Sequence, residues 1–158
     1  VRTPKIDGTN LTIIYKAGKM HLALTRGNGD RGDDVTELAR EIANIPQKIS
    51  TDHAQIVING ECVTDNDVEN FRNYVSGALG LKSPSEFKER NIKFIAHDIL
   101  SFTMNYTNKI DVLQNMGFFT VLDDAAWDYP CDGVVYRCND WQKCQNLGYT
   151  SKLSLIHI

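Results

Sequence analysis

The sequence lacks a long hydrophobic run and has no cysteine pair of the C-x-x-C type. No stretch of about 18 apolar residues occurs and no apolar signal-peptide region stands at the start, so we expect neither membrane association nor secretion. The cysteines lack zinc-ribbon spacing, and without a secretory feature we expect reduced thiols and a cytoplasmic location. The four cysteines are Cys62, Cys131, Cys138 and Cys144.

Repeats, low-complexity tracts and linkers rich in Pro, Gly or Ser are also absent, and 158 residues are of a length that fits one domain. The formal net charge of -3 argues against a protein that holds nucleic acid by bulk electrostatics alone. Local basic stripes and contacts from other domains remain compatible with that charge. Because the chain does not begin with methionine and a candidate motif starts at residue 5, we expect a fragment of a longer protein.

The hydrophobic pattern indicates β-hairpins and scattered helices rather than regular βαβ units, which predicts an α+β fold. Two β-rich runs are separated by four residues that include Gly18, a residue suited to a hairpin turn. The expected strands are 11–15, 20–25, 55–63, 92–100, 118–122 and 133–138, and the expected helices are 35–45, 65–81, 84–90 and 108–116.

The first segment with chemical potential is Lys5-Ile6-Asp7-Gly8, just before an apolar strand. A lysine attacks phosphorus only as the neutral amine, so such a nucleophile needs a desolvated or cationic site, where the fold could bury its stem. Asp7 could orient a nearby donor, and Gly8 would let the backbone turn sharply beside a nucleotide. Taken alone, the motif also fits a surface lysine before an Asp-Gly turn.

The second segment, 25–36, follows the predicted hairpin and is rich in glycine. Arg26 and Arg31 offer planar guanidinium groups for phosphate or ribose oxygens, beside the N-terminus of the expected helix. A flexible polar loop that caps a helix is the alternative interpretation.

Two further segments carry a charged residue that could contact a nucleotide, Glu61 in the first and Arg137 in the second. Glu61 ends a strongly apolar strand, where a carboxylate could bind a ribose hydroxyl or Mg²⁺. Arg137 shares one face of its predicted strand with Val135, and a buried cation there would need an anion such as phosphate. A solvated glutamate and an edge-strand arginine in solvent are the simpler alternatives.

In this order, the four segments resemble the nucleotidyltransferase motifs of bacterial-type NAD-dependent DNA ligases, over residues 3–152. ATP-dependent ligases and capping enzymes share the lysine, the glutamate and the later strand, whereas the 25–36 block and the ending at 147–152 resemble the NAD-dependent type. The resemblance implies an α+β nucleotidyltransferase (ATP-grasp-like) core with antiparallel sheets and flanking helices over residues 1–152. Residues 153–158 would then be a divergent tail, as a misread or vector-derived sequence would produce.

The resemblance also implies roles for individual residues. Lys5 would form the phosphoamide bond to AMP, with Asp7 and Gly8 completing its motif. Arg26 would lie near the ribose and the nick, and Glu61 would bind the ribose and help to place Mg²⁺.

Three other arginines acquire implied roles in the same way. Arg137 stands where the family usually has a lysine that neutralises the AMP phosphate. Arg72 falls in a segment that resembles the family's Pro-Arg-Asn-Ala, and it would contact DNA together with Arg31.

The sequence also departs from the family pattern. Thr3 stands where a glutamate commonly reads the adenine, so base selection could differ. Small residues are replaced at 74–77, and Gly80 occupies the place of a second arginine. After Lys152 the resemblance ends, before the segment that would carry a further catalytic lysine.

The implied reaction uses NAD and Mg²⁺: Lys5 takes AMP from NAD, and AMP passes to the 5'-phosphate of nicked double-stranded DNA for sealing in replication and repair. The N-terminal NAD-recognition region, the OB-fold and the C-terminal DNA-binding domains would lie in the rest of the ligase chain. We therefore expect this fragment alone to react poorly with NAD. An ATP-using polynucleotide ligase or capping-type enzyme, and a non-catalytic nucleotide-binding remnant, are the alternatives.

Overall fold

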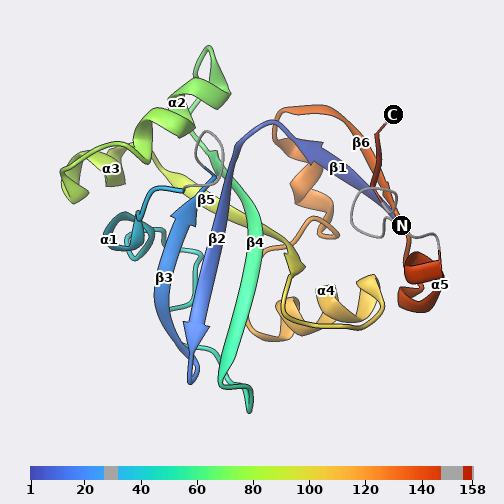
Figure 1. Ribbon diagram of the computed structural model, residues 1–158. Coiled ribbons are helices and arrows are strands. Elements are labelled where there is room, and N and C mark those ends of the chain that lie inside the picture. The colour runs from blue at the N-terminus through green and yellow to red at the C-terminus, as the bar shows by residue number, and fades with distance from the viewer. Residues whose placement is uncertain (27–31, 147–154, 158) are drawn as a thin grey trace.

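Two antiparallel sheets, which meet at the Asp7-Gly8 bend, organise the protein in a computed structural model that describes residues 1–26, 32–146 and 155–157 (Figure 1). The larger sheet has the strand order β3-β2-β4-β5 and the smaller one the order β1-β6-β7. The strands are β1 Arg2–Ile6, β2 Thr9–Lys16, β3 Lys19–Thr25, β4 Gln55–Thr64, β5 Ile92–Ile99, β6 Cys131–Arg137 and β7 Leu155–His157.

The β2–β3 hairpin confirms the prediction from the sequence. Its two turn residues, Ala17 and Gly18, have φ angles of 50° and 79°, as in the tight turns that match strand twist. A side chain at Gly18 would also place Cβ 2.6 Å from the carbonyl oxygen of Ile49. Only glycine therefore suits this turn.

The β4 strand lies in the centre of the larger sheet and pairs with both β2 and β5. Its Ile-rich sequence forms a strand because branched side chains pack well on a pleated surface. Gly60 is needed within it, since a Cβ there would lie 2.4 Å from the carbonyl oxygen of Ile95. The fully buried core contains Tyr15, Phe87, Phe94, Leu11, Ile13, Ile42, Ile56, Ile58, Ile95, Ile99, Ile110 and Leu113.

Short helices flank the sheets. Among them, α1 packs against β3, α2 against β4 and α4 against β5, which covers the larger sheet and places α2 and α4 near opposite ends of β5 (Figure 1). The helices are α1 Thr36–Ala39, α2 Phe71–Ala78, α3 Pro84–Glu89, α4 Tyr106–Asn115, the 3-10 helix η1 Asp124–Asp128, and α5 Trp141–Asn146.

Three predicted elements differ from the structure. The helix expected over 35–45 ends at Ala39, although Ile42 and Ile45 are buried as its apolar pattern requires. The helix expected over 65–81 begins only at Phe71, because Asn70 adopts the left-handed conformation with a φ of 51°. Segment 118–122 is no strand; it contributes one isolated bridge, between Ala96 and Thr120.

Several features at the ends of the chain were not anticipated. Lys5 lies within β1, a strand that the sequence analysis did not predict. Residues 155–157 of the expected tail form β7 on the edge of β6.

Cys62 and Cys131 are free thiols, whereas Cys138 is disulfide-bonded, so the expectation of four reduced cysteines is wrong. Within the described ranges, the helices are too short or too polar to cross a membrane.

Candidate active site

An open cavity of about 1030 Å³ has walls from both sheets and from α2 and α4. Ligand pockets commonly have volumes of about 300–1,000 Å³, so this cavity is large enough for a nucleotide. Arg31 lies outside the described residues. The other seven site residues predicted from the sequence all line the cavity: Lys5, Asp7, Gly8, Arg26, Glu61, Arg72 and Arg137.

Lys5 points into this cavity from an irregular part of β1. The pairing of β1 with β6 changes register between Pro4 and Ile6, on either side of Lys5, and such irregularities redirect side chains. The Lys5 Nζ lies 4.0 Å from Oδ1 of Asp132, and 41% of the Lys5 side chain is exposed. The expected burial of the lysine is therefore only partial, and its amine faces the cavity.

Asp7 and Gly8 form the bend between the two sheets. Oδ1 of Asp7 lies 3.9 Å from Nε of Arg72 on α2, so the aspartate is within ion-pair distance of a cation of the cavity. Gly8 lies at the bend expected from the sequence, and it also makes a close backbone contact. A Cβ there would lie 2.2 Å from the carbonyl oxygen of Cys62, so glycine allows β2 to approach β4 closely.

Glu61 extends from β4 into a network of two asparagines. Asn10 Nδ2 donates to Oδ1 of Asn59 at 3.1 Å and to Oε1 of Glu61 at 3.5 Å, and Asn59 Nδ2 donates back to Oδ1 of Asn10 at 3.0 Å. Burial raises the pKa of Glu61 to about 7, against the opposing effects of the Asn10 hydrogen bond and of Arg26 and Arg72. Glu61 is therefore an oriented acceptor whose charge is sensitive to its surroundings.

His97, on β5, faces Glu61 across the cavity. Its Nε2 lies 3.9 Å from Oε1 of Glu61, and 17% of its side chain is exposed. Burial, together with the cations Arg137 and Arg26, lowers the pKa of His97 to about 3. The imidazole is therefore neutral at physiological pH.

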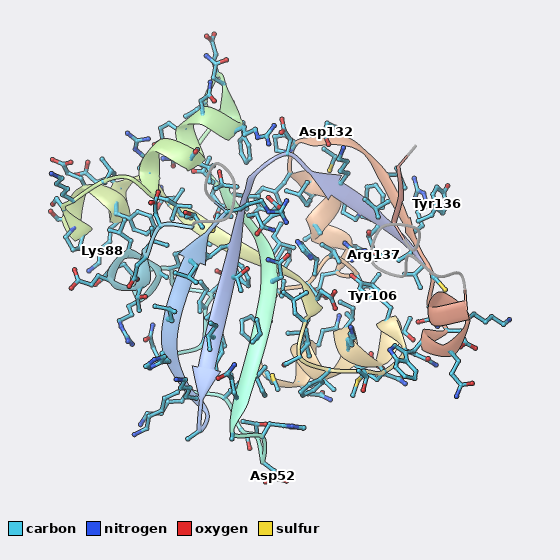
Figure 2. All side chains as sticks on the ribbon, viewed as in Figure 1. Asp52, Lys88, Tyr106, Asp132, Tyr136 and Arg137 are labelled. Atoms are coloured by element: carbon cyan, nitrogen blue, oxygen red, sulfur yellow. The ribbon has the colours of Figure 1, made fainter. Side chains whose placement is uncertain are left out.

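Arg137 is held by contacts on two sides. Its Nε donates to Oγ1 of Thr3 at 3.3 Å, and its guanidinium carbon lies 4.7 Å from the centroid of the Tyr106 ring (Figure 2). Val135, on the same strand, also lines the cavity, so both residues occupy the predicted common face. Arg137 is thus a fixed cation of the cavity wall rather than an edge residue in solvent.

Sequence reasoning missed several residues of this cavity, namely Asn10, Asn59, His97, Tyr106 and Asp132. His97 and Asp98 are adjacent polar residues that directly follow the apolar run 94–96 of β5, which is the signal that could have revealed them. The asparagines lie within strands, where this residue type is uncommon. Of the five missed residues, Asn59 and His97 lie inside strands predicted from the sequence, and their polarity there was the available signal.

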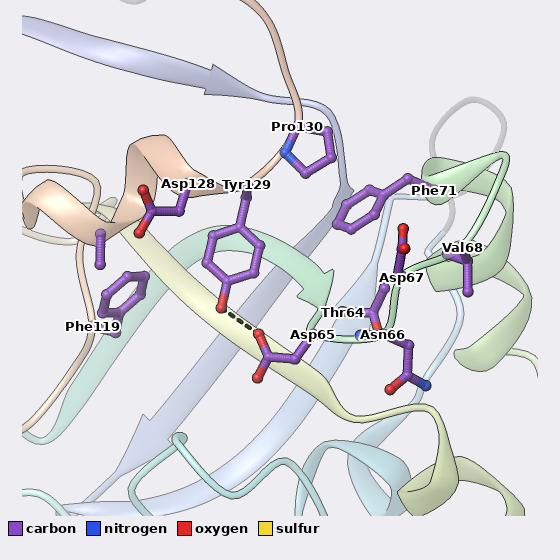
Figure 3. Close-up of a pocket in the computed structure, with 11 residues that line it drawn as sticks. Thr64, Asp65, Asn66, Asp67, Val68, Phe71, Phe119, Asp128, Tyr129 and Pro130 are labelled. Atoms are coloured by element: carbon purple, nitrogen blue, oxygen red, sulfur yellow. Dashed lines mark hydrogen bonds between the residues drawn. The ribbon is translucent and has the colours of Figure 1, made fainter.

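A second cavity, of about 510 Å³, lies beside the end of β4, between α2 and the η1 region (Figure 3). Within it, the Tyr129 hydroxyl donates to Oδ1 of Asp65 at 2.6 Å. None of the described site residues predicted from the sequence lines this cavity. The larger cavity is therefore the candidate active site.

The lining of the larger cavity includes the amine of Lys5, the carboxylate of Glu61 and three guanidinium groups. The guanidinium groups belong to Arg26, Arg72 and Arg137. Guanidinium groups bind phosphate oxygens through paired, charge-assisted hydrogen bonds. In a cavity with such groups, an amine can attack a phosphorus atom whose charge they offset. In the described part of the chain no cluster of three His, Cys, Asp or Glu residues could hold a metal ion by itself.

The fold of this chain is shared with that of a solved DNA ligase. A mycobacterial DNA ligase D complexed with ATP and MES superposes with a TM-score of 0.52 and 18% sequence identity, over 88% of this chain and 48% of that chain. The shared α+β arrangement of antiparallel sheets and flanking helices confirms the fold class predicted from the sequence.

The family follows from sequence comparison. The family model for the NAD-dependent DNA ligase adenylation domain matches residues 1–126, and the chain belongs to this family. It is 32% identical over 188 residues to a DNA ligase of Campylobacter jejuni subsp. doylei and 33% identical over 189 residues to one of Campylobacter lari. Each match covers 94% of this chain and 29% of the relative.

A DNA ligase of Anaplasma phagocytophilum is 31% identical over 180 residues, which cover 94% of this chain and 27% of the relative. The chain thus spans less than a third of the length of these relatives. Because each aligned stretch is longer than the 158 residues of this chain, the relatives carry insertions that this chain lacks.

Proposed function

We propose that this chain is the adenylation core of an NAD-dependent DNA ligase, in which Lys5 accepts AMP from NAD. The observation that carries the proposal is the convergence of Lys5, Glu61 and Arg137 on one cavity, although they come from three different strands. Membership of the adenylation domain family supports NAD as the AMP donor.

In the first step, the neutral amine of Lys5 attacks the adenylate phosphorus of NAD. A nitrogen–phosphorus bond forms, the bond to nicotinamide mononucleotide breaks, and the electron pair of that bond leaves with the mononucleotide. The amine proton passes to solvent, which reaches Lys5 because its side chain is partly exposed. Arg26 and Arg137 offset the charge of the phosphate, so positioning and electrostatics supply most of the rate.

The donors in this cavity are compatible with Mg²⁺. This ion is usually held by one or two carboxylates together with substrate phosphates and water, and Glu61 offers one carboxylate beside the region proposed for the phosphate. When bound, Mg²⁺ would supply further neutralisation of phosphate charge. Glu61 would hold it, while Asn10 keeps the carboxylate oriented.

The later steps of the proposed function involve DNA. AMP would pass from Lys5 to the 5'-phosphate at a nick, and the adjacent 3'-hydroxyl would then displace AMP and join the strands. Arg72, which is exposed at the mouth of the cavity, is the described candidate for a DNA contact, and Arg31 is another from the sequence. We propose a cytoplasmic location, and that NAD recognition and encirclement of DNA depend on regions found in the longer relatives.

A comparison of NAD with ATP tests the donor. The full-length product of the gene that encodes this chain would be incubated with each nucleotide labelled in its adenylate phosphate. We expect label on the wild-type protein from NAD, no label from ATP, and no label on Lys5→Ala. Labelling from ATP alone would instead establish an ATP-using ligase, and absence of label from both would establish a non-catalytic nucleotide-binding remnant.

A further inference from the structure

We propose that the second cavity is a docking site for an arginine side chain presented by a partner protein. Among the described residues, this cavity shares no lining residue with the larger one. The inference goes beyond the proposed function, because a partner held here would leave the candidate active site open for adenylation.

Three aromatic side chains form much of the apolar wall of the second cavity. Phe71 comes from α2, whereas Phe119 and Tyr129 come from either side of η1 (Figure 3). The rings of Phe119 and Tyr129 meet edge to face, with 6.4 Å between their centroids. All three side chains are partly buried against the hydrophobic core, which holds them in place. Aromatic rings of this kind attract a cation that lies over a ring face.

Exposed carboxylates stand beside these rings. Asp65 and Asp67 line the cavity from the loop after β4, and Asp128 lines it from the end of η1 (Figure 3). None of the three has an ion-pair partner among the described residues. The described lining also contains no Lys, Arg or His. The negative charge of the cavity is therefore not offset from within the described chain.

The acidic character extends along both segments that enclose the cavity. Residues 64–71 and 118–132 include no Lys or Arg, although the chain has 17 of these residues against 20 Asp and Glu. The acidic residues of the two segments are Asp65, Asp67, Glu69, Asp123, Asp124, Asp128 and Asp132. A surface of this charge repels phosphate-bearing ligands such as DNA and attracts a cationic partner.

The cavity is already organised without a ligand. The Tyr129 hydroxyl, which donates to Oδ1 of Asp65, fixes the ring relative to the carboxylate. Burial raises the pKa of Tyr129, and the Asp65 hydrogen bond and the charges of Asp65 and Asp128 raise it further. On the opposite wall, Nδ2 of Asn66 donates to the carbonyl oxygen of Glu89 at 3.1 Å. A partner would therefore have little of this site to order when it binds.

The arrangement suits a guanidinium group better than an ammonium group. A guanidinium is planar, so it can stack on an aromatic ring while its five N–H donors reach carboxylates on more than one side. Asp67 and Asp128 lie on different walls of the cavity, as such a fork requires. The volume of about 510 Å³ falls within the range of about 300–1,000 Å³ common for binding pockets, enough for the side chain and adjoining backbone.

A pair of peptides tests the proposal on the full-length protein. The probes are a dye-labelled tripeptide with arginine between two glycines and the same peptide with citrulline, which replaces the guanidinium by a neutral urea group. Binding would be measured by fluorescence polarisation at low salt. Asp67→Asn combined with Asp128→Asn removes two charges from the cavity, and Phe71→Leu removes a ring.

Glu86→Gln combined with Asp111→Asn is the matched control. It removes the same charge from two exposed residues that line neither cavity. Circular dichroism would establish that every variant is folded. Labelling of each protein by NAD would be followed in parallel, so that the proposed function is tested separately.

We expect the arginine peptide to bind wild type about tenfold more tightly than the citrulline peptide. The double aspartate variant and Phe71→Leu should each weaken its binding about three- to tenfold, and the control should change it less than twofold. Labelling by NAD should be unchanged in the double aspartate variant. Equal binding of the two peptides, or an equal loss in the control, would overturn the docking site. Absence of labelling in wild type would overturn the proposed function alone.

Discussion

The guanidinium of Arg137 lies over the ring of Tyr106, with 4.7 Å between the guanidinium carbon and the ring centroid. This contact accounts for the use of arginine where the resemblance implies a lysine. A guanidinium group is planar and can stack on an aromatic ring, whereas an ammonium group is a compact charge on a flexible stem. Tyr106 therefore fixes the direction in which the cation faces the cavity.

We predict that Tyr106→Leu slows the adenylation of Lys5 by about three- to thirtyfold, because Arg137 loses its aromatic support, and such contacts contribute about 0.5–2 kcal/mol. Tyr106→Phe keeps the ring and loses only the hydroxyl that donates to the His97 carbonyl. It should lower stability by about 1 kcal/mol and leave the rate close to that of wild type. Single-turnover kinetics measure the rates, and equal rates for the two variants would disprove the role of the ring.

At Gly60, the addition of a single carbon atom should change the stability of the protein. In Gly60→Ala the new Cβ would lie 2.4 Å from the Ile95 carbonyl oxygen and 2.5 Å from Cζ of Phe94. We expect the free energy of unfolding to fall by about 1–3 kcal/mol or more, as in other overpacked cores. Urea denaturation monitored by circular dichroism would measure it.

The control for this change is Gly77→Ala, in the exposed face of α2. Its Cβ would meet Nη1 of Arg90 at 3.5 Å, an ordinary contact. Because alanine is the better helix former, this variant should gain about 0.5–1 kcal/mol of stability. A loss of stability at Gly77 as large as that at Gly60 would contradict the steric explanation.

From the raised pKa of Glu61 we predict that the stability of the protein depends on pH. Its pKa rises from an ordinary 4.5 to about 7 in the folded protein, chiefly through burial. Between these values the folded state binds the proton and the unfolded state does not, so this group's contribution to stability falls as the pH rises from 4.5 to 7. The loss amounts to about 3 kcal/mol, an order-of-magnitude figure.

Glu61→Gln isolates this effect. The lowered pKa of His97 acts in the opposite direction, increasing stability as the pH rises towards 6.5, but it is present in both proteins. Urea denaturation at pH 5 and pH 8 should therefore show the variant gaining stability relative to wild type at the higher pH. A difference between the two proteins that stays constant with pH would mean that Glu61 titrates normally.

Local sequence patterns predicted the strands and hairpins well where one pattern dominated. The β2–β3 turn was specified by Gly18, and β4 by its run of branched residues. The helix over 65–81 was overextended because its apolar spacing does not reveal the left-handed Asn70. Phe118 and Val121 are buried as a strand would bury them, but they pack from an irregular segment, since burial alone does not fix backbone conformation.

Residues that belong to recognisable motifs, such as Lys5, Glu61 and Arg137, could be selected from the sequence, and they line one cavity. His97 could not be found in this way, because its position depends on a β-bulge that appears only when β5 is paired with β4. The close contact of Gly8 could not be predicted either, because its neighbour is the backbone of Cys62, more than fifty residues along the chain. For both His97 and Gly8, the decisive contacts join strands that lie far apart in the sequence.

The mass of the full-length protein after incubation with NAD and Mg²⁺ tests the central claim most directly. We expect one AMP adduct, located by peptide mapping on the peptide that contains Lys5, and no adduct on Lys5→Ala, with the folded state of the variant checked by circular dichroism. An adduct on a different lysine, or an adduct of equal yield on Lys5→Ala, would contradict the account.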